Sequence, residues 1–138
     1  MNKGISLSVT IIITLVIGTF VAYSQNFPDL TVTDIIFIQP SNCTPMTRNI
    51  TVNIKMKVEN IGNVTAFNFT DRLQLNGNEE VFNFFTSQLE PNAIKTHSVN
   101  TSRKCFVQFT ANATTDVTNK VQESNEANNN RFETYTPT

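Results

Sequence analysis

The sequence has little of the residue types on which catalytic and cofactor sites depend. It contains no tryptophan, one histidine, two cysteines and four glycines among 138 residues. Only Gly62 and Gly77 lie after the first 24 residues, so this part of the chain has no glycine-rich loop for a phosphate. The single histidine, His97, has no recognisable arrangement of base and orienting residue around it, so neither Cys43 nor Cys105 is expected to be a nucleophile. These shortages predict a protein that is not an enzyme and needs no cofactor.

Charge and helical periodicity are scarce as well. The formal net charge is −1 and the isoelectric point is about 5.7. A surface of this charge excludes the basic patch with which proteins bind nucleic acid. Beyond residue 24 no apolar pattern with a period of 3.6 residues runs for a useful length, which excludes a helical domain.

The first 24 residues are the one long apolar run in the sequence. Lys3 precedes the apolar stretch Ile5–Ser24, which has the composition of an export segment. In a first interpretation it is a cleaved signal peptide, with Ala22-Tyr23-Ser24 as the cleavage site before Gln25.

Two other interpretations of this segment stay open. Ile5–Tyr23 would span about 28 Å as a helix, just enough for an uncleaved membrane anchor. The segment also resembles the leader of archaeal type IV pilins and archaellins, which is cut after a glycine such as Gly4 and leaves an apolar helix that polymerises. All three interpretations place the rest of the chain outside the cell or on its surface.

Alternating apolar and polar residues, interrupted by turn residues, dominate the rest of the chain. This pattern predicts an all-β fold, an immunoglobulin-like antiparallel β-sandwich of about seven strands preceded by the apolar N-terminal helix. The expected strands are Leu30–Gln39, Asn49–Asn60, Phe67–Leu75, Glu80–Thr86, Ala93–Thr101, Lys104–Thr114 and Asn130–Thr136. The second strand has the clearest alternation, with an inward face formed by Ile50, Val52, Ile54, Met56 and Val58.

The third expected strand contains an inconsistency. Phe67, Phe69, Leu73 and Leu75 share one face by parity, but Asp71 falls on that same face. A carboxylate among core residues requires either a β-bulge or a bonding partner. The Asn76-Gly77 dipeptide that follows predicts a tight hairpin turn.

The two cysteines lie outside the export segment. In an oxidising compartment a single pair in a small domain favours a disulfide between Cys43 and Cys105. Cys105 alternates with Val107 and Phe109, so it is expected to face inward. Two separate buried thiols remain the alternative.

Six asparagines fit the acceptor pattern for N-linked glycans. They are Asn42, Asn49, Asn63, Asn68, Asn100 and Asn112. The acceptors that lie in expected strands alternate with other polar residues. We therefore expect Asn49, Asn68 and Asn112 to be exposed and able to carry a glycan.

A dense polar stretch near the C-terminus is interpreted as a structural turn before the last strand. It is formed by Glu123, Asn125, Glu126, Asn128 and Asn129, whose short side chains suit turn and cap bonding. We expect the side-chain amide of Asn128 or Asn129 to bond to backbone. The alternative is a calcium site with oxygen ligands from Asp116, Asn119, Glu123, Asn125, Glu126 and Asn128, although the spacing is not that of a calcium-binding loop.

Three blocks of the sequence resemble the CARDB domain (cell adhesion related domain found in bacteria). They are Pro28–Ile35, Lys57–Ala66 and Val121–Asn129, in the order of that family, and the resemblance covers residues 26–138. It implies an extracellular β-sandwich that acts as a cell-surface module in adhesion, envelope architecture or ligand presentation. Its partner would be a surface protein or a glycan that the resemblance does not name. The alternatives are a filament subunit that self-assembles through the N-terminal helix and a calcium- or carbohydrate-binding accessory domain.

Overall fold

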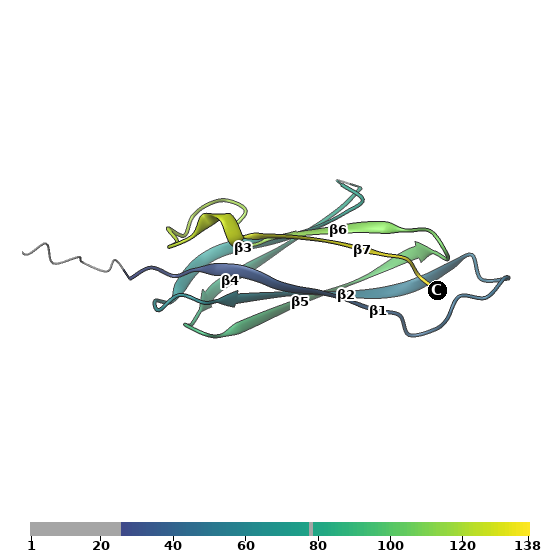
Figure 1. Ribbon diagram of the computed structural model, residues 1–138, viewed down its shortest axis with the longest axis horizontal. Coiled ribbons are helices and arrows are strands. Elements are labelled where there is room, and N and C mark those ends of the chain that lie inside the picture. The colour runs from purple at the N-terminus through teal and green to yellow at the C-terminus, as the bar shows by residue number, and fades with distance from the viewer. Residues whose placement is uncertain (1–25, 78) are drawn as a thin grey trace, which may run out of the picture.

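The computed structural model describes residues 26–77 and 79–138 as a sandwich of two antiparallel sheets (Figure 1). The first sheet has three strands in the order β1 (Leu30–Ile38), β2 (Asn49–Asn60) and β5 (Ile94–Lys104). The second has four, in the order β4 (Glu80–Leu89), β3 (Ala66–Leu75), β6 (Phe109–Thr114) and β7 (Asn130–Tyr135). A short 3₁₀ helix, η1 (Glu126–Asn128), leads into β7. The prediction of an all-β sandwich with seven strands is confirmed for these residues.

The core lies between the inner faces of the two sheets. In β2 the predicted face is confirmed, because Val52, Ile54, Met56 and Val58 are completely buried. The opposite sheet contributes Phe69, Leu73 and Leu75 from β3, together with two alanines of β6. The bounds of β2 agree with the prediction because its alternation is unbroken over twelve residues.

The expected inward position of Phe67 is wrong. Its side chain is 55% exposed, whereas Ala66 and Phe69 on either side are buried. The reason is the left-handed φ of 56° at Asn68, which interrupts the pairing of β3 with β4 but leaves the register the same on both sides. This local turn of the backbone puts Ala66, and not Phe67, on the buried face.

The expected strand Lys104–Thr114 begins too early. Lys104 ends β5, and a turn separates it from Phe109, the first residue of β6. Phe106 adopts a left-handed φ of 60°, which strand backbone does not allow, and Val107 is 52% exposed. Cys105 is therefore a half-buried loop residue and does not belong to an inward-facing strand.

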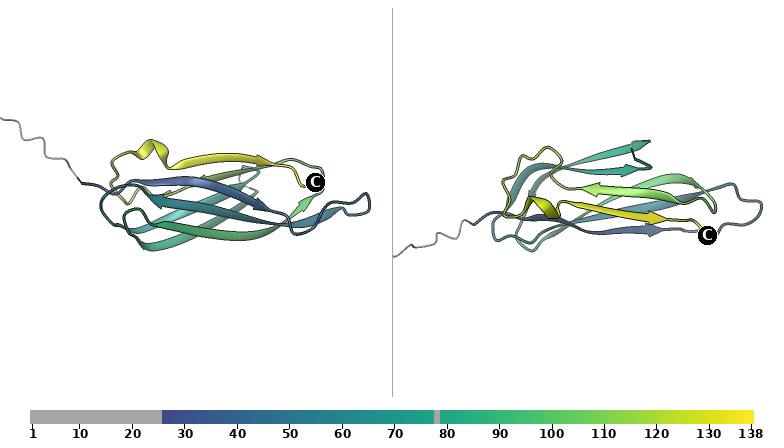
Figure 2. Two further views of the ribbon diagram at one scale, coloured as in Figure 1. Left: turned by 60° about the horizontal axis from the view of Figure 1, so that its bottom comes forward. Right: turned by 45° about the horizontal axis from the view of Figure 1, so that its top comes forward.

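The described chain enters at one end of the elongated sandwich and finishes near the other (Figures 1 and 2). We call the end with Asn26 the proximal end and the opposite end the distal end. Both β1 and β7 run from proximal to distal, and they lie side by side at one edge of the sandwich although they belong to different sheets. Among the described residues no helix has the length and apolar character to cross a membrane. The expected signal peptide, anchor or pilin-like leader lies outside those residues.

Candidate functional site

Asn60 is the centre of a bonding network at the proximal end. Its side chain is fully buried and uses all of its capacity for hydrogen bonds. The Oδ1 atom accepts from the backbone N–H groups of Asp29 and Gly62, both at 3.1 Å. The Nδ2 group donates to the carbonyls of Val64 and Leu89, at 2.8 and 2.9 Å. One side chain therefore joins the segment before β1, the β2–β3 turn and the end of β4.

Gly62 lets the β2–β3 turn lie directly on the segment before β1. A Cβ atom at this position would lie 2.5 Å from the backbone nitrogen of Asp29 and from the carbonyl oxygen of Phe27. No side chain fits in that space, and the backbone of Ile61 donates to the Asp29 carbonyl at 2.8 Å. Nothing local in the sequence marks this contact.

The polar stretch before β7 bonds to the beginning of β1. Glu123 is only 8% exposed, and its carboxylate accepts from the backbone N–H of Leu30 and from Asn129 Nδ2, the latter at 3.0 Å. Burial raises the pKa of Glu123 from 4.5 to about 7, against these two hydrogen bonds, which lower it. Glu126 accepts from the backbone N–H of Glu123 at 3.1 Å, and Asn125 caps η1.

A second set of bonds holds Asp29 and Thr31 to the same stretch. The Asp29 carboxylate accepts from Ser124 Oγ and from Asn128 Nδ2, each at 2.7 Å. The hydroxyl of Thr31 donates to the Asn128 carbonyl at 3.1 Å. We name the contacts of Asp29, Leu30 and Thr31 with Glu123, Ser124 and Asn128 the proximal clamp.

The side-chain amides of Asn128 and Asn129 do not bond to backbone, and that expectation is wrong. Both donate to carboxylates, because Asp29 and Glu123 approach them from the start of β1 and from the turn itself. Within the described residues their Oδ1 atoms are buried and have no hydrogen-bond partner.

The residues of the alternative calcium site do not form one cluster of acidic ligands. In the described part of the chain, no three acidic, histidine or cysteine side chains lie close enough to hold an ion. Asp116 accepts from the backbone N–H groups of Lys120 and Val121, at 3.1 and 2.7 Å, and so closes its own loop. Asn119 is exposed on that loop.

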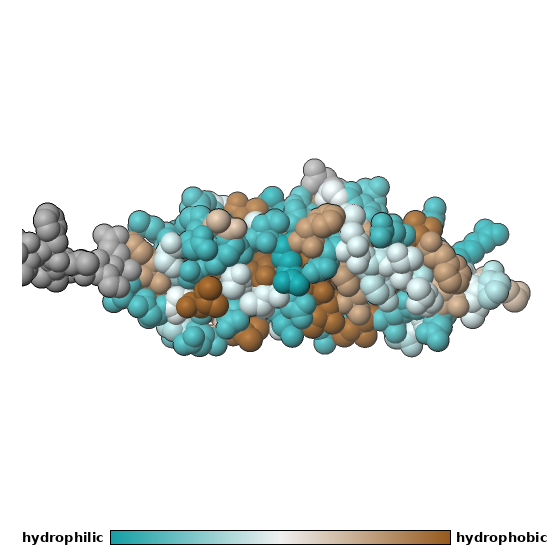
Figure 3. Space-filling model, viewed as in Figure 1, coloured by the Kyte–Doolittle hydropathy of each residue, from teal (hydrophilic) through white to brown (hydrophobic). Residues whose placement is uncertain are grey.

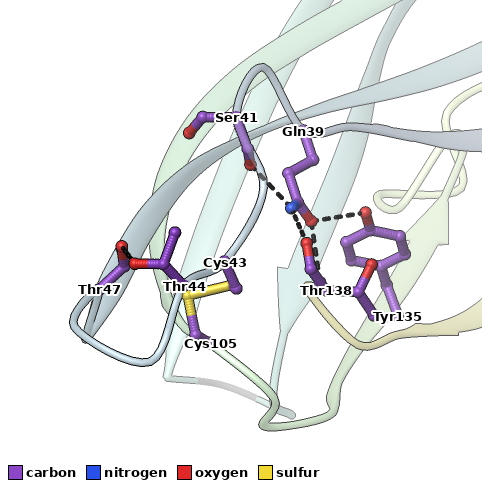
Figure 4. Close-up of a disulfide and its surroundings, with 8 residues drawn as sticks. All are labelled: Gln39, Ser41, Cys43, Thr44, Thr47, Cys105, Tyr135 and Thr138. Atoms are coloured by element: carbon purple, nitrogen blue, oxygen red, sulfur yellow. Dashed lines mark hydrogen bonds between the residues drawn. A yellow bond between two sulfur atoms is a disulfide. The ribbon is translucent and has the colours of Figure 1, made fainter.

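The distal ends of β1 and β7 are bonded in a similar way (Figure 4). Gln39 Oε1 accepts from the hydroxyl of Tyr135 at 3.0 Å and from the backbone N–H of Thr138 at 3.2 Å. Gln39 Nε2 and the backbone N–H of Cys43 both donate to the Thr138 carbonyl. We name these contacts of Gln39 and Cys43 with Tyr135 and Thr138 the distal clamp.

A disulfide joins Cys43 to Cys105 beside the distal clamp, with an S–S distance of 2.08 Å (Figure 4). It connects the β1–β2 loop to the β5–β6 loop, and no described cysteine is free. The backbone N–H of Phe106 donates to the Pro137 carbonyl at 3.0 Å, so the C-terminal segment is bonded to both loops.

Asp71 has partners from two strands, β4 and β5, and from the loop after β6, which explains a carboxylate in the core. It is fully buried, and it accepts from Thr115 Oγ1 at 2.6 Å and from Thr86 Oγ1 at 3.3 Å. His97 Nε2, from the opposite sheet, lies 2.7 Å from Asp71 Oδ2. The imidazole stacks on Phe84 with the ring centroids 4.5 Å apart. This arrangement connects the two sheets through polar contacts. The sequence could not reveal it, because the partners of Asp71 lie far from it along the chain.

Comparison with known proteins assigns the chain to a family. The CARDB family matches residues 27–133, which is most of the chain. The chain belongs to the CARDB family. No curated protein matches it.

Solved CARDB domains have the same fold. One from Pyrococcus furiosus, in complex with di-metal ions, has 28% sequence identity and a TM-score of 0.67, covering 80% of this chain and 94% of that one. A solution structure of a Pyrococcus furiosus CARDB domain has 26% identity and a TM-score of 0.62, covering 80% and 95%. A domain of a candidate cell-surface protein from Methanosarcina acetivorans shares the fold at 23% identity and a TM-score of 0.53, covering 81% and 93%.

The candidate glycan acceptors lie on the surface of this CARDB domain. Five of the six asparagines are exposed, and Asn112 is half-buried. Its Oδ1 accepts from Asn130 Nδ2 at 2.8 Å, so the amide oxygen and not the nitrogen makes this bond. The face seen in Figure 3 is mostly hydrophilic with separate apolar spots.

Proposed function

We propose that the chain is an exported, non-enzymatic cell-surface module whose sandwich serves as a stiff spacer in adhesion or envelope architecture. The observation that supports this role is the pair of clamps. The proximal clamp and the distal clamp tie the first strand to the C-terminal segment at both of its ends. Membership of the CARDB family supports a location at the cell surface.

A spacer must resist a pull along its long axis. Tension between the two ends of the described chain would slide β1 toward the proximal end and β7 toward the distal end. Because β1 is paired with β2 from Leu30 to Ile38, its ladder bonds must break together under such shear. The clamps add side-chain bonds that oppose the same movement, since they join β1 to the segment that is pulled the other way.

Single-molecule stretching tests this role. Asp29→Ala removes two bonds of the proximal clamp and Gln39→Ala removes the side chain of the distal clamp, so each should lower the unfolding force. Thr96→Ala, at an exposed position in β5, is the control and should leave the force unchanged. Equal forces in all four proteins would contradict the proposal.

The disulfide provides an internal measure in the same experiment. Its cysteines are 62 positions apart, so unfolding of the oxidised protein should extend the chain by roughly 210 Å less than unfolding of the reduced protein. A single length in both states would mean that the pull does not pass through β1 and the C-terminal segment.

The N-terminal residue of the mature protein tells how the module is held. Gln25 supports secretion, Met1 supports a membrane anchor, and Ile5 supports a filament subunit that polymerises through its N-terminal helix. In each case protease added to intact cells should degrade the protein, and a protein protected in intact cells would contradict the surface role.

Divalent cation binding is a second candidate function. The Pyrococcus furiosus domain was solved in complex with di-metal ions. In this chain the carboxylates of Glu123 and Glu126 both bond to the amide of Asn129, whose buried Oδ1 has no partner among the described residues. With the amide turned over, Asn129 Oδ1 would lie beside the two carboxylates and could bind an ion together with them. This candidate predicts that chelator lowers the melting temperature, that calcium restores it, and that Glu123→Gln abolishes the response. A melting temperature that chelator leaves unchanged would reject cation binding.

A further inference from the structure

Two disulfide-linked loops form an apolar surface at the distal end. The β1–β2 loop exposes Met46, which is 94% exposed, and the β5–β6 loop exposes Phe106 and Val107, at 61% and 52%. Residues of both loops line a surface cavity of about 440 Å³. Ligand cavities in proteins commonly have volumes of about 300–1,000 Å³.

The charges around this cavity have one sign. Arg48 and Lys104 line it, both are exposed, and no acidic residue lines it. Neither cation has a carboxylate partner in the part of the chain that the structure describes, whereas the adjacent Arg103 is paired with Glu80 at 2.7 Å. A negatively charged ligand would therefore bind these two cations without displacing a carboxylate that is already paired with them.

Phe106 is held in an unfavourable conformation. A left-handed φ of 60° is costly for a bulky side chain, and glycine or asparagine would adopt it more easily. The disulfide at Cys105 and the bond from the Phe106 N–H to Pro137 fix this backbone. Strain of this kind, in a residue that displays an aromatic ring to solvent, is typical of functional positions.

We propose that this distal tip, formed by Met46, Arg48, Lys104, Phe106 and Val107, binds an acidic peptide segment that also carries an apolar side chain. The exposed apolar side chains and the cavity hold the apolar group, while the two cations bind the carboxylates. The disulfide keeps both loops in place before binding, which lowers the entropy cost of association. This binding site does not depend on the spacer role.

A peptide fits these observations better than an anionic membrane does. A bilayer surface does not fill a cavity, and a chain with a net charge of −1 is not drawn to anionic lipid as a whole. Binding to vesicles is therefore an outcome of the test that would overturn the proposal.

Fluorescence anisotropy with three labelled peptides tests the proposal on the protein as cells export it. N-glycans are first removed enzymatically, because Asn49 lines the cavity and a glycan there would block it. The peptides alternate glutamate with leucine, lysine with leucine, and glutamate with serine. At low ionic strength we expect the glutamate–leucine peptide to bind about tenfold more tightly than either of the others, and to weaken as salt is added.

Charge reversal locates the site. The double variant Arg48→Glu/Lys104→Glu should lose about tenfold in affinity for the glutamate–leucine peptide and should bind the lysine–leucine peptide instead. Lys95→Glu, at an exposed position near the proximal end of β5, is the control and should bind like the unchanged protein.

Phe106→Asn separates binding from folding. Asparagine tolerates the left-handed backbone, so the melting temperature should hold or rise while affinity falls about fivefold. Equal binding of the three peptides, unchanged binding by the double variant, or pelleting with phosphatidylglycerol vesicles without peptide binding would each overturn the proposal.

Discussion

Asn60 offers a sharp test of how the proximal end is held together. Replacing it with alanine leaves four backbone groups without partners, namely two N–H groups and two carbonyls. Water cannot easily replace the bond to the Leu89 carbonyl, which is buried. The substitution therefore removes a junction between three segments and not only a single contact.

The expected cost follows from the four bonds. A typical hydrogen bond contributes about 1 kcal/mol net, and a buried group left unpaired costs roughly 1–3 kcal/mol. The bond to Leu89 is buried, whereas the other three lie at partly buried sites where water can enter the new space. We expect Asn60→Ala to lower the free energy of unfolding by about 3–4 kcal/mol, which corresponds to about 10–20 °C in melting temperature.

Urea and thermal unfolding measure this difference, with Thr96→Ala as the control at an exposed strand position. Asn60→Asp adds a second check. It keeps the acceptor for the N–H groups but places a carboxylate against the carbonyls of Val64 and Leu89, so it should be unstable at pH 7 and recover partly on acidification. A loss below about 1 kcal/mol in Asn60→Ala would refute the reasoning.

Three further predictions concern other parts of the chain. Alkylation of the native protein without reductant should find no free thiol, and reduction of the Cys43–Cys105 bond should cost about 4 kcal/mol. Burial raises the pKa of Glu123 from 4.5 to about 7. The protonated side chain therefore contributes fully to the free energy of unfolding below pH 4.5, and this contribution is lost as the pH rises toward 7. Glu123→Gln should abolish the change in stability over this pH range in unfolding measurements. In a source that makes N-linked glycans, mass spectrometry should find a glycan on at least two of the six acceptors, and Asn112→Gln should remove the mass of one if that site is used.

The predictions from sequence succeeded where the pattern was long and local. β2 agrees residue by residue because twelve alternating positions leave one possible register. The predictions failed where one residue adopts a left-handed conformation, as Asn68 does before Phe69 and as Phe106 does before β6. Asparagine tolerates this conformation but most asparagines in a strand do not adopt it, and phenylalanine rarely does, so the inward position of Phe67 and the early start of β6 were wrong.

Contacts between distant segments were the other limit. The sequence showed that Asp71 needed a partner, but it could not show that Thr115 and His97 approach from β-strands and loops 26–44 positions away. The carboxylates that bind Asn128 and Asn129 were visible as residues, but the arrival of Asp29 beside them depends on the whole fold. Asn60 was treated as the last residue of a strand because nothing local marks its four bonds.

The disulfide has a consequence for survival outside the cell, where proteases are present. The β2–β3, β3–β4 and β4–β5 connections all lie between Cys43 and Cys105 in the sequence. A single cut in any of them, for example at the exposed Asn92, produces two fragments that stay covalently joined and share both sheets. A nicked molecule would run as one band without reductant and as two bands with it, and a cut in one of these loops would not release either fragment from the other.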